Sequence, residues 1–326
     1  MYQTMSKTDL IKKLETERIS RVITYTTSDR APFATKIAND IIPLLGNQLD
    51  AIGKVKKISL FLYTSGGDML APIRIVKLIR NHCDEFEILV PYKAHSAGTL
   101  ICMGADTIVM GKLGELTPVD PTTDHPFNPQ NPSNPQQRLP VSVEDLNSYL
   151  LFAKEKAGVK EDQMIDSYKL LVEKLHPLSI GNAYRAYRMA KMVSERLLWL
   201  HMDKNDEKIK KIVKEMTGDI TIHAYPIDRD EATELGLKIE KATDGVDKTM
   251  RELYDTYADE MKLGQPFHPN ELLAGKDSAD FERPGAYLET TDLAYQFTFA
   301  GKVQKTIKNN QPSIDLNFES QSWVKK

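Results

Sequence analysis

The sequence has few cysteines, no long apolar run and no excess of charge of one sign, and each absence excludes a class of protein. Only two of its 326 residues are cysteines, Cys83 and Cys102, too few for a disulfide scaffold or a four-cysteine zinc site. The 43 basic and 46 acidic residues give a net charge of −3, which argues against a nucleic-acid partner, because such proteins concentrate positive charge. The 41% of hydrophobic and 27% of charged residues are typical of a globular protein, which excludes disorder and coiled coil.

The sequence also lacks a segment that would span a membrane or direct export. A helix that crosses a bilayer needs about 20 apolar residues. The longest candidate here, Ile58–Tyr63, has six. The residues Met1–Arg18 are polar and contain no apolar stretch of the kind that signal peptides carry. We therefore expect a cytoplasmic protein with no membrane partner, and the residues present suggest no cofactor and no metal.

Strand and helix patterns alternate in the first third of the chain. Short β-branched or continuously apolar segments, typical of buried strands, are Arg21–Thr27, Lys57–Tyr63, Phe86–Val90 and Thr107–Met110. Apolar residues at helical spacing separate them, after an amphipathic helix at Lys7–Arg18. Repeated strand–helix crossovers predict an α/β fold with a largely parallel sheet.

The rest of the chain changes character twice. Seven prolines between Pro118 and Pro140 predict an extended, exposed loop. Helical patterns follow over 143–157, 163–175 and 180–201. Beyond residue 241 we expect a helix over 247–262 and a β-hairpin over 286–306, with its turn near Ala300-Gly301. We therefore predict a core domain over 1–240, with the loop 118–140 and a helical insertion 143–201, and a small C-terminal α+β subdomain over 241–326.

Three short segments contain residue types that packing does not explain. In Thr64–Asp68 (TSGGD), paired glycines after a buried strand let backbone amides face an oxyanion. In Ala94–Thr99 (AHSAGT), Ser96 begins a helix, where a serine is either a nucleophile or a helix cap. In Gly114–Pro121 (GELTPVDP), Asp120 is held beside prolines, which suits either an orienting acid or a turn. His95 precedes Ser96, but adjacent side chains usually diverge at such a turn, which disfavours His95 as a base.

In this order, the motifs resemble those of the serine dehydrogenase proteinase family, distant relatives of the Clp-protease proteolytic subunit and of signal peptide peptidase A. The resemblance runs from Arg21 to Ile239, about two thirds of the chain, over the segments SGGD, HSAGT, GADTIVMG, ELTPVDP and HAYPIDRDEATELGL. It implies the ClpP/crotonase-like fold of stacked ββα units, with a helical arm used in oligomerisation.

The resemblance also implies roles for individual residues. Ser96 becomes the nucleophile, the backbone amides of Gly66, Gly67 and Ala97 form the oxyanion hole, and Asp120 is the acid. Three histidines are candidates for the base: His223 in the last motif is the first choice, His176 the alternative and His125 an outsider. The window 136–151, in which signal peptide peptidases would place a lysine base, contains Arg138 but no lysine, and Lys154 follows it.

These implications predict a cytoplasmic serine peptidase that acts on peptides or proteins as a homo-oligomer. Two alternatives remain open. One is a non-catalytic or trigger-dependent oligomeric effector, in which Ser96 only caps a helix. The other is a crotonase-type acyl-CoA enzyme, for which Glu115 is the nearby glutamate. No ATP-binding motif is present, so ATP-driven unfolding would need a separate ATPase partner.

An apolar and aromatic stretch bears on assembly. Residues 180–201 place such side chains, Leu198 and Trp199 among them, on more than one helix face. One face is enough to cover a core, and the surplus would be an exposed patch larger than monomers tolerate. We therefore expect this helix at a contact between subunits.

Overall fold

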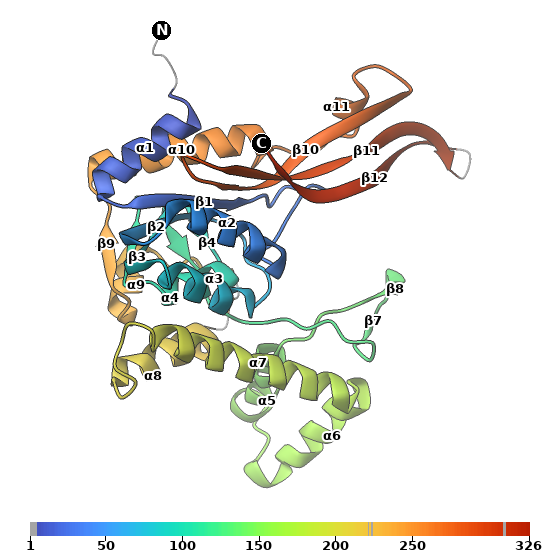
Figure 1. Cartoon of the computed structure of the whole chain (residues 1–326). Coiled ribbons are helices and arrows are strands. Elements are labelled where there is room, and N and C mark those ends of the chain that lie inside the picture. The colour runs from blue at the N-terminus through green and yellow to red at the C-terminus, as the bar shows by residue number, and fades with distance from the viewer. Residues whose placement is uncertain (1–4, 221, 223, 309–310) are drawn as a thin grey trace. The chain divides into compact units, whose positions relative to one another are not determined.

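The computed structural model describes residues 5–220, 222, 224–308 and 311–326. The chain divides into two compact units. Unit 1 is formed by Met1–Leu116 and Pro226–Lys326, and unit 2 by Thr117–Tyr225. Figure 1 labels most of the helices and strands of the two units.

An eight-stranded sheet with the order β12-β11-β10-β1-β2-β3-β5-β9 forms the centre of unit 1. Its parallel part consists of β1 (Arg21–Thr27), β2 (Val55–Tyr63), β3 (Cys83–Val90), β5 (Thr107–Met110) and β9 (Ile239–Lys241). The predicted α/β fold with a large, mostly parallel core sheet is confirmed. The bounds of β1 and β5 coincide with the predicted ones, because both are short runs rich in the β-branched residues that favour strands.

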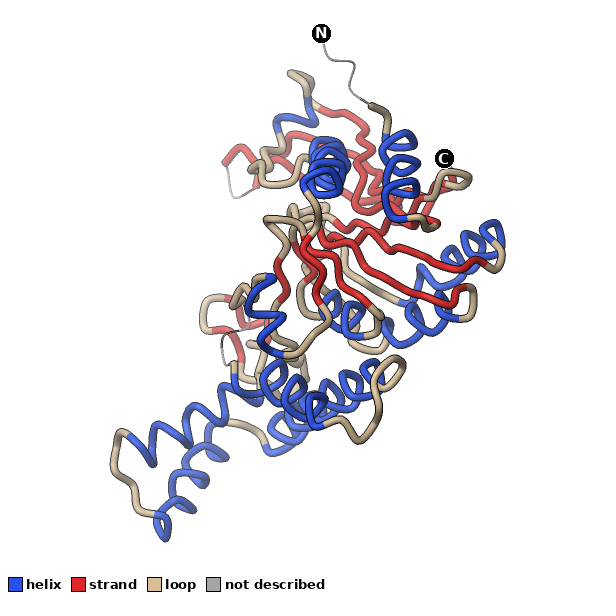
Figure 2. The backbone as a smooth tube through the Cα atoms, turned by 90° about the vertical axis from the view of Figure 1, so that its left-hand side faces the viewer, coloured by secondary structure: helices blue, strands red, loops and turns tan. Residues whose placement is uncertain are grey.

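Helices cover both faces of this sheet. The helices α1 (Lys7–Arg18) and α10 (Asp244–Met261) lie on one face, and α2 (Ile42–Ile52), α3 (Ala71–Arg80) and α4 (Ala97–Met103) lie on the other (Figure 1). Figure 2 shows the twisted strands from a second side. Alternate strand residues such as Phe61 and Leu89 pack in one cluster with Leu14 of α1 and Leu253 of α10. Since successive side chains of a strand point to opposite faces of the sheet, Leu60, the neighbour of Phe61, lies on the opposite face.

The last three strands extend the same sheet. They are β10 (Ser278–Glu289), β11 (Ala294–Lys308) and β12 (Gln311–Lys325), which pair antiparallel in sequence order, and β10 also pairs antiparallel with β1. These three strands therefore share a sheet with β1, whereas the sequence analysis expects them in a small C-terminal subdomain. The short helix α11 (Asn270–Leu273) packs with Phe33, Phe281 and Phe299 in a second cluster.

The predicted hairpin turn near Ala300-Gly301 is wrong. Both residues lie inside β11 at a shift of register with β12, and the chain reverses instead between Glu289 and Ala294. A Cβ on Gly301 would lie 2.1 Å from the carbonyl oxygen of Asn317. The glycine thus marks a bulge with a close backbone approach, which has the same sequence pattern as a turn.

Unit 2 is largely helical. Its elements are β7 (Gln130–Asn131), β8 (Asn134–Arg138), α5 (Val143–Glu155), η2 (Glu161–Gln163), α6 (Met164–Lys174), α7 (Pro177–Leu198), α8 (Glu207–Lys214) and η3 (Glu215–Asp219). The extended proline-rich segment and the three helices after it are confirmed. Leu198 is completely buried, so its expected place at a subunit contact is wrong, whereas Trp199 is exposed. Among the described residues, no helix has both the length and the apolar character that crossing a bilayer requires.

Four further elements belong to unit 1: η1 (Asn39–Ile41), β4 (Lys93–Ala94), β6 (Glu115–Leu116) and α9 (Arg229–Leu235). The helix α9 ends at Gly236, whose φ of 106° supplies the left-handed cap. The strands β4 and β6 pair in parallel next to the main sheet. The strand β4 ends two residues before Ser96, and β6 begins at Glu115.

Candidate active site

Ser96 stands at the turn between β4 and α4 in an uncommon backbone conformation. Its φ is 50° and its ψ is −108°, which a residue with a side chain rarely adopts. The side chain makes no capping hydrogen bond to α4. Ser96 therefore occupies the position of a helix cap without making the hydrogen bond that defines one.

The glycine loop after β2 lies against this turn. Gly66 has a φ of 111°, and a Cβ at this position would lie 2.9 Å from the Cβ of Ser96 and 3.3 Å from its Oγ. The next residue, Gly67, lies against a different segment, since it forms a parallel β-bridge with Ile37. A Cβ on Gly67 would lie only 2.1 Å from the Ile37 carbonyl oxygen. Both glycines are thus required by close approach.

The three amides expected in an oxyanion hole differ in their partners. The Gly66 N–H donates to the Thr64 hydroxyl at 3.0 Å, so this amide is occupied. In the described part of the chain, neither the Gly67 N–H nor the Ala97 N–H donates a hydrogen bond to another residue. Ala97 is the first residue of α4, where helix amides have no partner within the helix. Two donors are therefore left to receive a ligand.

His95 is paired with an acidic residue that the sequence does not place near it. Its Nε2 lies 2.9 Å from Oε1 of Glu115. The register of β4 and β6, in which Lys93 faces Glu115 and Ala94 faces Leu116, brings the two residues together. The pair ties β4 to β6 one residue before Ser96. No local motif signals it, because it depends on pairing between segments 20 residues apart.

The remaining candidates lie in unit 2 or outside the described residues. Asp120 is in unit 2 and is 9% exposed. His176 caps α7, where its Nδ1 accepts a hydrogen bond from the Leu178 N–H at 3.2 Å, and its ring stacks on Phe127 at 4.1 Å. His125 accepts from the Phe127 N–H through Nδ1. His223, the first choice for the base, lies outside the described residues.

The two thiols are poor rivals of Ser96 as nucleophiles. Burial raises the pKa of Cys83 to about 11 and raises the pKa of Cys102, inside α4, still further. Both thiols are therefore protonated at neutral pH, and the thiolate is the reactive form.

Comparison with known proteins gives four relevant likenesses. An uncharacterized protein of Methanocaldococcus jannaschii is 29% identical over 204 residues, which are 63% of this chain and 60% of that protein. A second one from the same organism is 24% identical over 266 residues, 80% of this chain and 79% of that protein. This chain thus spans 60% of the length of the first relative.

Two solved structures are more distant. ClpP1 from Listeria monocytogenes is 15% identical with a TM-score of 0.36, over 72% of this chain and 97% of that one. A mutant of a membrane-bound stomatin-specific protease is 15% identical with a TM-score of 0.37, over 66% and 79%. A family model matches residues 1–177, a stretch that includes Ser96, both glycines and Asp120. The chain belongs to the family of ClpP-like serine proteinases of the SDH type.

Proposed function

We propose that the protein is a serine peptidase and that Ser96 is its nucleophile. The observation that carries the proposal is the uncommon backbone of Ser96, held next to Gly66 at the start of α4. Such a conformation costs about 1–3 kcal/mol, and residues that adopt it cluster at active sites. The family supplies the reaction class, hydrolysis of peptide bonds.

The proposed reaction follows from the atoms at this turn. The Ser96 Oγ attacks the carbonyl carbon of a peptide bond while a base takes its proton. The amides of Gly67 and Ala97 donate to the oxyanion of the tetrahedral intermediate, and Gly66 contributes by its close fit rather than by its occupied amide. The base then gives its proton to the nitrogen of the scissile bond, the intermediate expels the amine, and water hydrolyses the acyl-enzyme.

The acid and the base of this reaction are assigned by family resemblance. Asp120 is the proposed acid and His223 the proposed base. His176 is the weaker choice, because its Nδ1 accepts a hydrogen bond from Leu178. A neutral ring that accepts at Nδ1 carries its proton on Nε2, and so it has no lone pair left for the serine proton.

Labelling with a fluorophosphonate tests the nucleophile. Such probes form a covalent adduct with an activated serine, and we expect one adduct, which peptide mass spectrometry assigns to Ser96. The matched control is Ser96→Ala, which removes one oxygen atom. Equal labelling of the two proteins, or no labelling of the native one, rejects Ser96 as an activated nucleophile. The second result supports the non-catalytic effector. An increase of melting temperature with coenzyme A would instead support an acyl-CoA enzyme.

We further propose that the peptidase is a cytoplasmic homo-oligomer that acts on peptides or proteins, with any unfolding supplied by a separate ATPase. The exposed apolar side chains of α7 and its C-terminal end support the assembly; they are Leu178, Tyr184, Met192 and Trp199. A single chain has a mass of 36.9 kDa, so light scattering on the purified protein tests this assembly directly.

A further inference from the structure

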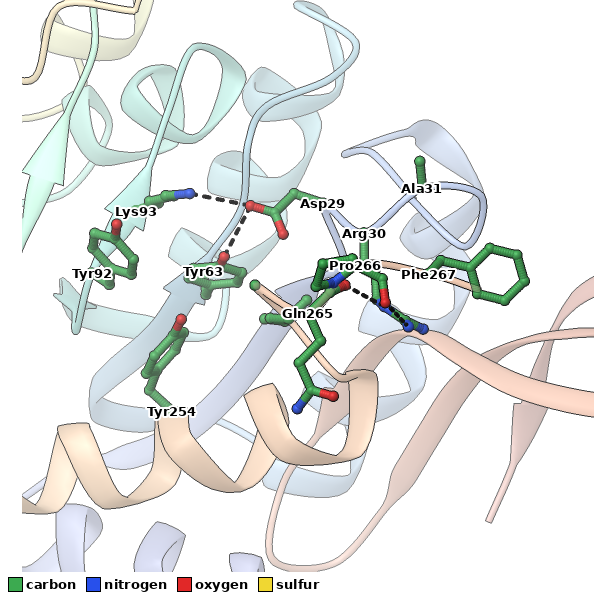
Figure 3. Close-up of a pocket in the computed structure, with 12 residues that line it drawn as sticks. Asp29, Arg30, Ala31, Tyr63, Tyr92, Lys93, Tyr254, Gln265, Pro266 and Phe267 are labelled. Atoms are coloured by element: carbon green, nitrogen blue, oxygen red, sulfur yellow. Dashed lines mark hydrogen bonds and ion pairs between the residues drawn. The ribbon is translucent and has the colours of Figure 1, made fainter. Parts of the chain in front are cut away.

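A cavity of about 490 Å³ in unit 1 is lined by residues that the proposed hydrolysis does not use (Figure 3). It lies beyond the carboxyl ends of β1, β2 and β3, since Asp29, Tyr63 and Tyr92 stand at or just after those ends. Ligands of open α/β sheets bind at this edge. The volume also lies in the range of small-molecule sites.

One side of the cavity is an aromatic wall. The ring centroids of Tyr63 and Tyr254 are 5.0 Å apart, those of Tyr92 and Tyr254 are 5.8 Å apart, and those of Tyr63 and Tyr92 are 6.2 Å apart. The rings pack on one another, so no ligand fits between them. They present a single surface to the cavity, and Figure 3 shows Gln265 and Pro266 across from it.

The opposite side is fixed by a buried arginine. The Arg30 side chain is 4% exposed, and it donates through Nε to the carbonyl of Gln265 at 2.9 Å and through Nη2 to that of Pro266 at 3.1 Å. These bonds attach the loop 263–267 to the end of β1. The cavity is therefore formed before a ligand arrives, which lowers the ordering cost of binding.

An ion pair borders the aromatic wall. Asp29 Oδ2 accepts from Lys93 Nζ and from the Tyr63 hydroxyl, each at 3.2 Å, and both charged side chains are about one quarter exposed (27% and 25%). Burial raises the pKa of Tyr63, which keeps its hydroxyl protonated and donating. Among the described residues, none donates to Asp29 Oδ1, and Lys93 has two further N–H groups. The pair thus offers one anionic acceptor and one cationic donor side by side.

We propose that this cavity binds a free α-amino acid with an aromatic side chain. The ammonium of the ligand lies against Asp29 Oδ1, its carboxylate against Lys93 Nζ, and its ring against the wall of Tyr63 and Tyr254. A zwitterion carries both charges on neighbouring groups, so it matches the ion pair without a net change of charge. A ligand with only a positive charge would be repelled by Lys93, and a ligand with only a negative charge would be repelled by Asp29. The site does not require Ser96, so it stands apart from the proposed peptidase activity.

Titration calorimetry of the full chain with L-phenylalanine tests the proposal. Three ligands that each lack one group are the matched controls: phenethylamine lacks the carboxylate, 3-phenylpropionate lacks the ammonium, and glycine lacks the ring. We expect phenylalanine to bind at least tenfold more tightly than each of them. Asp29→Asn, which keeps the shape of the side chain, and Tyr254→Ala should each weaken phenylalanine binding at least tenfold. Asp277→Asn, an exposed position paired with Lys305, should leave binding unchanged.

Several results would overturn this site. One is the absence of binding heat with the native protein up to the solubility limit of phenylalanine. Another is equal binding of phenethylamine or of 3-phenylpropionate, since one charge would then suffice. A third is unchanged binding in Asp29→Asn. The comparison of the four ligands uses only the native protein, so it decides the matter even if a variant does not fold.

Discussion

Gly66 and Ser96 approach so closely that a Cβ at position 66 would lie 2.9 Å from the Cβ of the serine. The same Cβ would be 3.3 Å from the Ser96 Oγ. Residue 66 therefore fixes the space beside the proposed nucleophile, although its own amide donates to Thr64. A side chain introduced at position 66 would displace the Ser96 hydroxyl without removing any group that takes part in the reaction.

Gly66→Ala should lower turnover on the order of 10²-fold, because even a small displacement of a nucleophile is costly. Its φ of 111° also disfavours a side chain, so the free energy of unfolding should fall by about 1–3 kcal/mol. Steady-state kinetics and urea unfolding measure the two effects. Gly67 does not suit this test, because any side chain introduced there would collide with the backbone of Ile37 and disrupt the fold.

Gly46→Ala is the matched control for Gly66→Ala. Gly46 lies within α2, and a Cβ there would meet no atom within 4 Å. We expect unchanged turnover and a gain of up to about 1 kcal/mol in stability from the higher helix propensity of alanine. Full activity of Gly66→Ala would show that the glycine loop does not border the reacting serine.

Ser96→Ala and Ser96→Gly should both abolish hydrolysis but differ in stability. At a φ of 50°, alanine keeps the backbone strain, whereas glycine adopts this conformation without a penalty. We expect Ser96→Gly to be more stable than Ser96→Ala by about 1 kcal/mol, measured by urea unfolding. A glycine variant that is the less stable of the two would mean that the native backbone is unstrained. Turnover above a few per cent in either would reject Ser96 as the nucleophile.

His95→Ala should reduce turnover severalfold rather than abolish it. The side chain holds Glu115 at 2.9 Å and so ties β4 to β6, and its loss loosens the turn that carries Ser96. Glu115→Gln keeps a hydrogen bond but removes the charge, and it should have a smaller effect. Kinetics of both variants beside Ser96→Ala make the comparison. If His95→Ala were as inactive as Ser96→Ala, His95 would replace His223 as the proposed base.

Thiol reagents should leave the activity unchanged near neutral pH. Because burial raises the pKa of Cys83 to about 11, its thiol is protonated below that pH and becomes reactive only as the pH approaches it. Incubation with iodoacetamide at pH 7, followed by kinetics and intact mass, tests this. Rapid modification of Cys83 together with loss of turnover would contradict both its burial and the assignment of a serine nucleophile.

Local patterns in the sequence predicted the local structure well. The bounds of α1, β1 and β5 follow from local patterns of residues that need no information from distant parts of the chain. The turn at Ala300-Gly301 was misplaced because a glycine in a strand bulge and one in a turn look alike until the partner strand is known.

The functional features that the sequence did not predict are all non-local. The pairing of His95 with Glu115 depends on the register of two short strands. The cavity collects residues from five segments between Asp29 and Phe267, and none of these segments carries a motif that indicates a binding site. By contrast, the family resemblance predicted Ser96 and the glycine loop as parts of one site. The two lie near each other because β2 and β3 are neighbouring parallel strands, which end at the same edge of the sheet.

Replacing exposed apolar residues of α7 by lysine should dissociate the proposed homo-oligomer without unfolding the chain. Tyr184 is 56% exposed and Met192 is 38% exposed, and both line one groove on the surface of α7. We expect the double variant Tyr184→Lys/Met192→Lys to fall to a mass near 36.9 kDa in light scattering, with its melting temperature little changed.

Leu198→Lys is the contrasting variant: Leu198 is completely buried, so a charge there should destabilise the fold by several kcal/mol whatever the assembly state. A native protein that already has the mass of one chain at micromolar concentration would rule out the assembly, and an intact oligomer in the double variant would place the contact on another surface.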